Sequence, residues 1–278
     1  MDGALSPDSK CIAEKRGIMA FTLYKHAWLW IGSEDEEPQL SHAECKALLR
    51  KGGWLVRNTY DFDCGEETGF WNVVKDSFGG MEELSSKMRN QVRRSMANYE
   101  FRRMTRDELL AVGYDVHRAA AKGYKVKASV PTEEDFRNDI MSGPENDFWG
   151  AFDKSDGHLA AFAKNIVYER MCDYSVMKAR PDELARYPYY GLIYTMNEYY
   201  LKECGLRYVN DGGRSITEHS NIQPFLMQKF NFRKAYCRIS IVYKPWLAMM
   251  VKVLYPFRKW LPVASVRSLL NQEEMTRL

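Results

Sequence analysis

The chain has 278 residues, of which 45% are apolar and 28% charged, and its 40 Lys and Arg nearly balance its 37 Asp and Glu. This composition excludes a disordered or low-complexity chain, and the length allows one large domain or two small ones with a buried core. The charges are segregated, because residues 84–106 hold seven bases and one acid, and residues 219–272 hold nine bases and no acid. If these two stretches meet in space, they form a basic surface suited to an anionic partner.

Residues 1–18 are polar and without a pattern, so we expect them to be poorly ordered. The segment after them shows signals of strands and capped helices. Ser41 and Glu44 have the capping-box spacing and predict a helix over 41–49. Apolar residues at every fourth position predict a second helix over 82–97. Strand composition marks residues 21–31, 54–60 and 71–75.

From about residue 98 onward the predicted elements follow the order β-α-α-β-β-β-α-β-α-β. Thr105 with Glu108, and Thr132 before an acidic first turn, mark two helix starts. The predicted helices cover 105–122, 131–141, 189–203 and 221–230. The predicted strands cover 148–153, 158–169, 171–178, 207–210 and 235–243. This order predicts an α/β (α+β) fold in which helices flank both faces of one mixed, mostly antiparallel sheet.

Two stretches carry a family resemblance over about residues 99–243. The helix from Leu84 to Arg94 is similar to the basic helix that opens FemAB-like acyltransferase domains, and the run Phe225–Phe232 followed by a strand is similar to the end of GNAT domains. Together with the order of elements, they resemble the GNAT superfamily of N-acetyltransferases and, more narrowly, its FemAB-like branch. The resemblance implies transfer of an acyl group from acyl-CoA or acetyl-CoA to an amine. Met227 stands where the family commonly has a tyrosine general acid, so that role is not assigned here.

The segment 180–191 stands where the family holds the pyrophosphate of CoA, although it has a single glycine, Gly191. A helix that starts near Tyr189 or Tyr190 presents unpaired N–H groups, which suit phosphate. We therefore expect Tyr189, Tyr190 and Gly191, with the preceding Lys178 and Arg180, to bind the cofactor. The alternative is an ordinary helix begun by proline, in which the glycine packs on the sheet.

The densest polar run of the sequence covers residues 210–223 and lies between a predicted strand and a predicted helix. This places it at the carboxyl end of a strand, where open α/β sheets tend to bind ligands. Asp211 or His219 would take a proton from an attacking amine, and Arg214, Ser215 and Asn221 would bind the acceptor. The alternative is a glycine-containing loop followed by an ordinary helix cap.

The C-terminal residues 246–261 place Trp, Met and Phe side chains at helical spacing among basic residues. One hypothesis is a helix that packs back on the domain; the other is an anchor on an anionic membrane surface. No stretch approaches the roughly 20 apolar residues of a membrane span. We therefore expect a cytoplasmic protein, with peripheral contact to the inner face of the membrane in the second case.

The cysteines form no CxxC pair, and His42 with Cys45 has no second ligand pair, so we expect free thiols and no metal. The expected organisation is a disordered 1–18, an N-terminal α/β extension over 19–97, an acyltransferase core over 98–243 and a basic amphipathic tail over 244–278. The expected partners are a small-molecule amine as the acceptor and, as an alternative to acyl-CoA, an acyl carrier protein as the donor. Nucleic acid enters only as tRNA, in the alternative of a FemAB-like aminoacyl-tRNA-dependent transferase. The third hypothesis is a catalytically silent GNAT-like binding or membrane-associated protein.

Overall fold

Local sequence signals determine where several helices begin. In the computed structural model, which describes residues 12–14, 19–122, 131–142, 146–215, 222–258 and 260–278, Ser41 and Glu44 form the predicted capping box of α1 (His42–Lys51). Helix α4 (Glu133–Met141) has a second capping box, made by Thr132. Helix α3 (Arg106–Lys122) begins after Thr105, whose hydroxyl accepts a hydrogen bond from the Glu108 amide at 3.1 Å. These helix starts are confirmed.

The chain divides into two compact units. Among the described residues, unit 1 contains 74–212 and 222–233, and unit 2 contains 12–14, 19–73, 213–215 and 234–278. These units cut across the boundaries predicted from the sequence. Helix α2 (Ser86–Asn98) belongs to unit 1, and the last strand, β11 (Arg233–Tyr243), belongs almost entirely to unit 2 because it pairs with an N-terminal strand.

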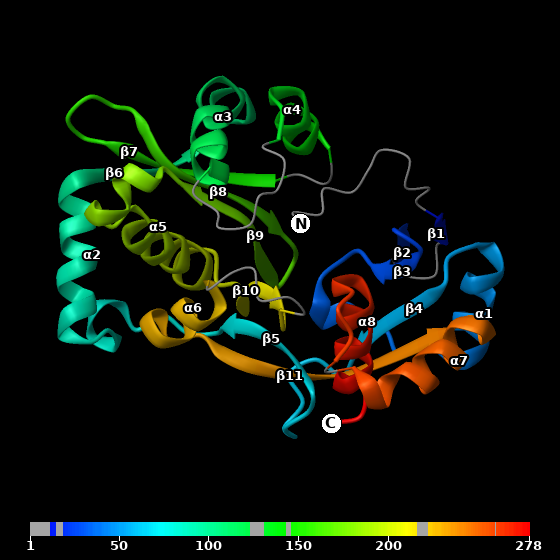
Figure 1. Ribbon diagram of the computed structural model, residues 1–278. Coiled ribbons are helices and arrows are strands. Elements are labelled where there is room, and N and C mark those ends of the chain that lie inside the picture. Colours follow the sequence, from blue (N-terminus) through cyan, green and yellow to red (C-terminus); the bar gives the residue numbers. More distant parts are fainter. Residues whose placement is uncertain (1–11, 15–18, 123–130, 143–145, 216–221, 259) are drawn as a thin grey trace. The chain divides into compact units, whose positions relative to one another are not determined.

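Unit 1 is built on a mixed, mostly antiparallel sheet with the order β10-β9-β8-β7-β6. Its strands are β6 (Tyr99–Met104), β7 (Asn146–Asp153), β8 (Leu159–Val167), β9 (Met171–Ala179) and β10 (Tyr208–Gly213). Only β9 and β10 pair in parallel. Helices α3 and α4 lie on one side of these strands, whereas α2 and α5 (Pro188–Asn197) lie on the other (Figure 1). A 3-10 helix (Pro181–Arg186) precedes α5, a π-helical turn (Glu198–Glu203) follows it, and α6 (Ile222–Phe230) follows β10.

Strand β9 contains a β-bulge that changes which way its side chains point. Its Tyr174 pairs with Asn165 of β8, whereas Val176 pairs with the adjacent Lys164, so Ser175 is an extra residue. Because adjacent residues of β8 face opposite sides of the sheet, Tyr174 and Val176 do as well. Val176 packs into the core beneath α3 and α4, and the Tyr174 hydroxyl bonds a side chain of α5.

Unit 2 contains a second set of strands in the order β1-β2-β3-β4-β11. The first four are β1 (Ile12–Glu14), β2 (Met19–Tyr24), β3 (Ala27–Trp30) and β4 (Leu55–Tyr60), and β5 (Phe70–Lys75) lies beside β11 with its last two residues in unit 1. Short 3-10 helices at Glu34–Glu36, Gly80–Glu83 and Tyr255–Phe257 and the helices α7 (Pro245–Leu254) and α8 (Ala264–Met275) complete the elements. Among the described residues, no helix combines the length and apolar character needed to cross a bilayer.

The prediction of a single strand over residues 21–31 is wrong. The segment is the hairpin β2–β3, whose turn residues Lys25 and His26 have φ angles of 43° and 77°. Glycine, asparagine and aspartate are the residues that usually signal such a turn. Neither turn residue belongs to that group, so the composition gave no break between the two strands.

Candidate active site

The strands β9 and β10 separate at their carboxyl ends. They pair only over Tyr208–Asn210 and Met171–Asp173, and then β9 continues to Ala179 while β10 continues to Gly213. Beyond Asn210 and Asp173, the backbones of β10 and β9 no longer pair with each other. A carboxyl-end opening of this kind is where α/β sheets tend to bind ligands, and the predicted polar run begins here.

Asp211 is the first residue of β10 beyond this pairing. Its side chain is half-buried, and within the described part of the chain no hydrogen bond or ion pair holds its carboxylate. Burial raises the pKa of Asp211 to about 7. A carboxyl group with a pKa near the ambient pH suits the acceptance and return of a proton.

The backbone around Asp211 is fixed by its neighbours. The side-chain Nδ2 of Asn210 donates to the Asp173 carboxylate at 2.9 Å, and the side-chain Oδ1 of Asn210 accepts from the backbone amide of Gly212 at 2.9 Å. Gly212 has a φ of 84°, a left-handed conformation that glycine adopts readily. The Gln223 side chain then donates to the Gly212 carbonyl at 3.3 Å. These contacts hold the strand end that carries Asp211.

Tyr174 is a residue of this site that the sequence did not single out. Its ring is buried on the side of the sheet that faces α5, and its hydroxyl donates to Asn197 Oδ1 at 2.8 Å. Asp211 lies on the same side. Val209 pairs with Cys172, so their side chains share one side of the sheet, and Asp211 and Tyr174 each follow two residues later in their strands and point to that same side. Burial first, and then the charges of Cys172 and Asp211, raise the pKa of Tyr174. Tyr174 therefore stays protonated near the carboxylate.

The start of α5 uses its backbone donors within the protein. The buried Ser95 hydroxyl donates to the Tyr187 carbonyl at 2.6 Å and accepts from the Gly191 amide at 3.1 Å. The Tyr190 amide donates to the Tyr187 carbonyl at 3.0 Å. A Cβ at Gly191 would lie 2.2 Å from the Phe101 ring and 2.7 Å from Ser95 Oγ. These contacts favour the packing alternative for Gly191 over direct contact with a phosphate.

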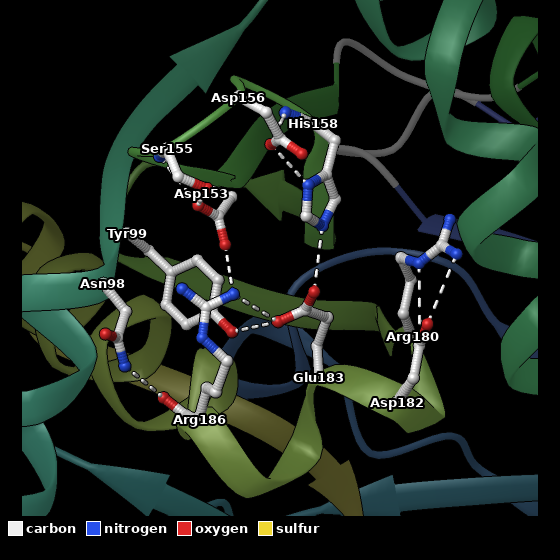
Figure 2. A network of polar contacts seen from close by, with 10 residues as sticks. All are labelled: Asn98, Tyr99, Asp153, Ser155, Asp156, His158, Arg180, Asp182, Glu183 and Arg186. Atoms are coloured by element: carbon white, nitrogen blue, oxygen red, sulfur yellow. Dashed lines mark hydrogen bonds and ion pairs between the residues drawn. The ribbon is translucent and has the colours of Figure 1, made fainter.

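The arginines of the same loop are also paired. Arg186 joins the buried Asp153 and Glu183, and Arg180 lies 3.5 Å from Asp182, as Figure 2 shows. Hydrogen bonds from Ser155 and Arg186 hold the pKa of the Asp153 carboxyl well below its usual range. The loop that precedes α5 is therefore closed by its own ion pairs.

Three further groups extend this network. The Tyr99 hydroxyl donates to Glu183 at 2.5 Å, and the two ring nitrogens of His158 lie 2.6 Å from Asp156 and 3.0 Å from Glu183 (Figure 2). Ligand atoms of Asp153, His158 and Glu183 lie within 4.8 Å of one another, which is a spacing that a metal ion could use. The Arg186 guanidinium bonds both carboxylates of that set, so it already supplies the positive charge.

The structure separates the remaining predicted cofactor residues. Lys178 is buried and follows the bulge of β9, so it faces α3 and α4, whereas Asp211 faces α5. The Tyr190 ring packs against Phe225 and Phe230 with centroids 5.2 and 6.2 Å apart. Tyr189 is half-buried in the first turn of α5.

The predicted acceptor residues fall in different parts of the chain. Arg214 and the exposed Ser215 belong to unit 2, while Asp211 belongs to unit 1. The Arg214 guanidinium donates to the Gly69 carbonyl at 2.7 Å and stacks on Trp71, 4.4 Å from the ring centroid. His219 and Asn221 lie outside the described residues.

Comparison with solved structures identifies the fold. The chain is similar to FemX, with a TM-score of 0.53, 9% identity, and coverage of 80% of this chain and 84% of FemX. It is also similar to the C-terminal domain of a protein assigned as a lysylphosphatidylglycerol synthetase from Agrobacterium fabrum, with a TM-score of 0.52, 11% identity, and coverage of 85% and 84% of the two chains. The fold is GNAT-like. The predicted resemblance to the FemAB-like branch is thus confirmed at the level of the fold. No protein-family model matches the sequence, and no curated protein matches it.

Proposed function

We propose that this GNAT-like chain transfers an acyl group to an amine and that Asp211 is the general base. The observation that carries the proposal is a half-buried carboxylate of raised pKa, without a described partner, at the separated ends of β9 and β10. The amine nitrogen attacks the acyl carbonyl carbon and loses a proton to Asp211. The bond between that carbon and the donor's sulfur or oxygen breaks, and the leaving thiol or hydroxyl takes up a proton.

The donor is an acyl thioester of CoA or of an acyl carrier protein. The paired arginines and the satisfied amides before α5 bear on the choice between them. They favour a donor that does not place a pyrophosphate at the start of α5, such as the phosphopantetheine arm of a carrier protein. The same feature supports the alternative of an aminoacyl-tRNA donor, which also places no pyrophosphate of CoA at the start of α5.

The test of the proposed function is turnover with each donor. Acetyl-CoA, long-chain acyl-CoA, acylated carrier protein and aminoacyl-tRNA are each incubated with a panel of amines, and amide formation is followed by mass spectrometry. Asp211→Asn is expected to lower the rate about 100- to 10,000-fold, the usual effect of a general base. Asp107→Asn, an exposed carboxylate in the first turn of α3, is the matched control and should keep the rate. Normal turnover by Asp211→Asn would contradict the proposal, and no turnover with any donor would favour the catalytically silent alternative.

A specific surface favours peripheral membrane association as a second function. We call it the C-terminal apolar face; its exposed members are Trp246, Met249, Met250, Val253, Phe257 and Trp260. Leu247 and Val251 of α7 are buried at 4% exposure, whereas Met249 and Val253 are 70% and 60% exposed, so the helix has one packed side and one open apolar side. Contiguous exposed apolar patches of this kind mark interaction sites.

The charges around this face indicate which partner it fits. The exposed Lys252 lies next to Val253 in α7, and no acidic residue occurs between 219 and 272. Tryptophan and bulky apolar side chains with lysine and arginine suit the interface of an anionic bilayer. We therefore assign the C-terminal apolar face to an anionic lipid surface, which would place the protein on the inner face of the cytoplasmic membrane.

Vesicle flotation tests this assignment. The full chain should float with phosphatidylglycerol vesicles and much less with phosphatidylcholine vesicles. Met249→Glu with Val253→Glu should abolish flotation, while Val112→Glu, at an exposed apolar position in α3, should leave it unchanged. Equal flotation by the double variant, or none by the unchanged chain, would contradict the assignment.

A further inference from the structure

Unit 2 contains a small polar cavity that the transfer chemistry does not use. It has a volume of about 70 Å³ and lies over strands β3, β4 and β5. A water-sized group needs roughly 10–15 Å³ of such space, so the cavity holds about five to seven of them. Its walls combine the aromatic rings of Trp30 and Phe70 with the glycines Gly32 and Gly213 and the polar side chains of Glu34, Glu37, Arg57, Thr59 and Asn72.

Arg57 is the positive group of this cavity. No carboxylate of the described residues lies within ion-pair distance of its guanidinium, and no hydrogen bond of the structure holds it. Burial lowers the pKa of Arg57, and the charges of Glu37 and Glu34 oppose this effect. The Arg57 side chain is half-buried, and its planar fork of N–H donors fits a carboxylate in two parallel hydrogen bonds.

Glu37 is, with Glu34, one of two negative groups in the lining of the same cavity. The Asn58 side chain and the Thr59 amide donate to one of its carboxylate oxygens, at 2.9 and 2.7 Å, and fix the group in place. Burial raises the pKa of Glu37 to about 7, even though Arg57 acts in the other direction. Arg57 and Glu37 thus line one cavity within electrostatic reach of each other but without a direct ion pair.

A third group in the wall is incompletely bonded. Asn72 is buried at 1% exposure, and its Oδ1 has no hydrogen-bond partner. Its amide nitrogen donates to the Cys237 sulfur at 3.4 Å. A buried amide oxygen is normally hydrogen-bonded, so this one indicates a donor that the chain itself does not supply.

We propose that this cavity binds a small zwitterion, a ligand that carries one carboxylate and one ammonium group, such as a free α-amino acid with a small side chain. The carboxylate bonds the Arg57 guanidinium, the ammonium group pairs with the Glu37 carboxylate, and Trp30 and Phe70 exclude water from the sides. The volume limits the ligand to the size of glycine or alanine. The cavity lies wholly within unit 2, so the site is independent of acyl transfer at Asp211.

Calorimetric titration of the full chain without any acyl donor tests the site. The probes are glycine, acetate, which has only the carboxylate, and methylamine, which has only the ammonium group. Glycine should bind at least tenfold more tightly than either single-charge probe, because each charged hydrogen-bonded contact contributes about tenfold or more. Equal affinity of acetate and glycine, or no heat with glycine, would overturn the proposal.

Two variants assign the charges. Arg57→Gln should weaken glycine and acetate about ten- to hundredfold and leave methylamine unchanged, whereas Glu37→Gln should weaken glycine and methylamine but not acetate. Arg50→Gln, an exposed arginine of α1, is the control and should leave all three affinities unchanged. Glycine binding that survives Arg57→Gln would place the ligand elsewhere. The unaltered chain with its three probes decides the matter if a variant fails to fold.

Discussion

Asp153 and Asp211 both lie near the ends of strands in unit 1, but their surroundings shift their pKa values in opposite directions. Asp153 accepts hydrogen bonds from Ser155 and pairs with Arg186, and its pKa is well below the usual range. Asp211 has no described hydrogen-bond or ion-pair partner, and its pKa rises to about 7. The polar network around Asp153 therefore holds the structure together, whereas the isolated carboxylate of Asp211 is the group suited to proton transfer.

The largest loss of stability is expected at Gly191, which packs tightly at the start of α5. In Gly191→Ala, the new methyl group would lie 2.2 Å from the Phe101 ring and 2.7 Å from Ser95 Oγ. Overpacking a buried contact of this kind should lower the free energy of unfolding by about 3 kcal/mol. Urea unfolding measures the loss. Gly65→Ala, which has no atom within 4 Å of the added Cβ, should change stability by less than about 0.5 kcal/mol. Equal stability of both variants would contradict the packing role of Gly191.

A smaller effect should follow from Asp153→Asn. The variant leaves Arg186 with Glu183 alone, and we expect a loss of about 2 kcal/mol near pH 7. Because the folded pKa of Asp153 is lowered, its ionisation stabilises the fold above the unfolded pKa of about 4, and this contribution disappears as the pH falls through the folded value. Urea midpoints of the variant and the unaltered chain should therefore converge in acid. A difference that is independent of pH would show that the pair is not electrostatic.

The third effect has the opposite sign, because it is a gain in stability. Because the folded pKa of Asp211 is raised, ionisation of its carboxyl group opposes folding. The free energy of unfolding of the unaltered chain therefore falls as the pH rises from about 4 to about 7. Asp211→Asn should thus match the unaltered chain near pH 4 and exceed its stability by about 4 kcal/mol at pH 8, because each unit between the ordinary pKa and about 7 corresponds to about 1.4 kcal/mol. Thermal or urea unfolding at the two pH values checks this. A variant that is less stable at pH 8 would indicate a hidden partner for the carboxylate.

Short-range signals were readable from the sequence. The capping residues Ser41, Thr105 and Thr132 marked helix starts to within a residue, and the order of elements from residue 98 predicted the fold. The strand end that carries Asp211 followed from its position between a strand and a helix.

Contacts between distant residues were not readable. The two hydrogen bonds of Ser95 to the loop before α5 join residues more than 90 positions apart. The bulge at Ser175, which turns Lys178 away from Asp211, leaves no mark in composition. The ion pairs of Arg186 arise from the packing of β7 against that loop, so a segment that looked like a phosphate site is closed by its own residues.

The most direct test of Asp211 as the proton acceptor is a measurement of the pKa of its carboxyl group. Carbon-13 NMR of the side-chain carboxyl groups, followed from pH 3 to pH 9, gives this value, and the signal lost in Asp211→Asn assigns it. We expect a titration midpoint near 7 for Asp211, whereas the Asp153 carboxyl group should stay ionised down to the lowest pH. A midpoint near 4 for Asp211 would contradict its role as the proton acceptor.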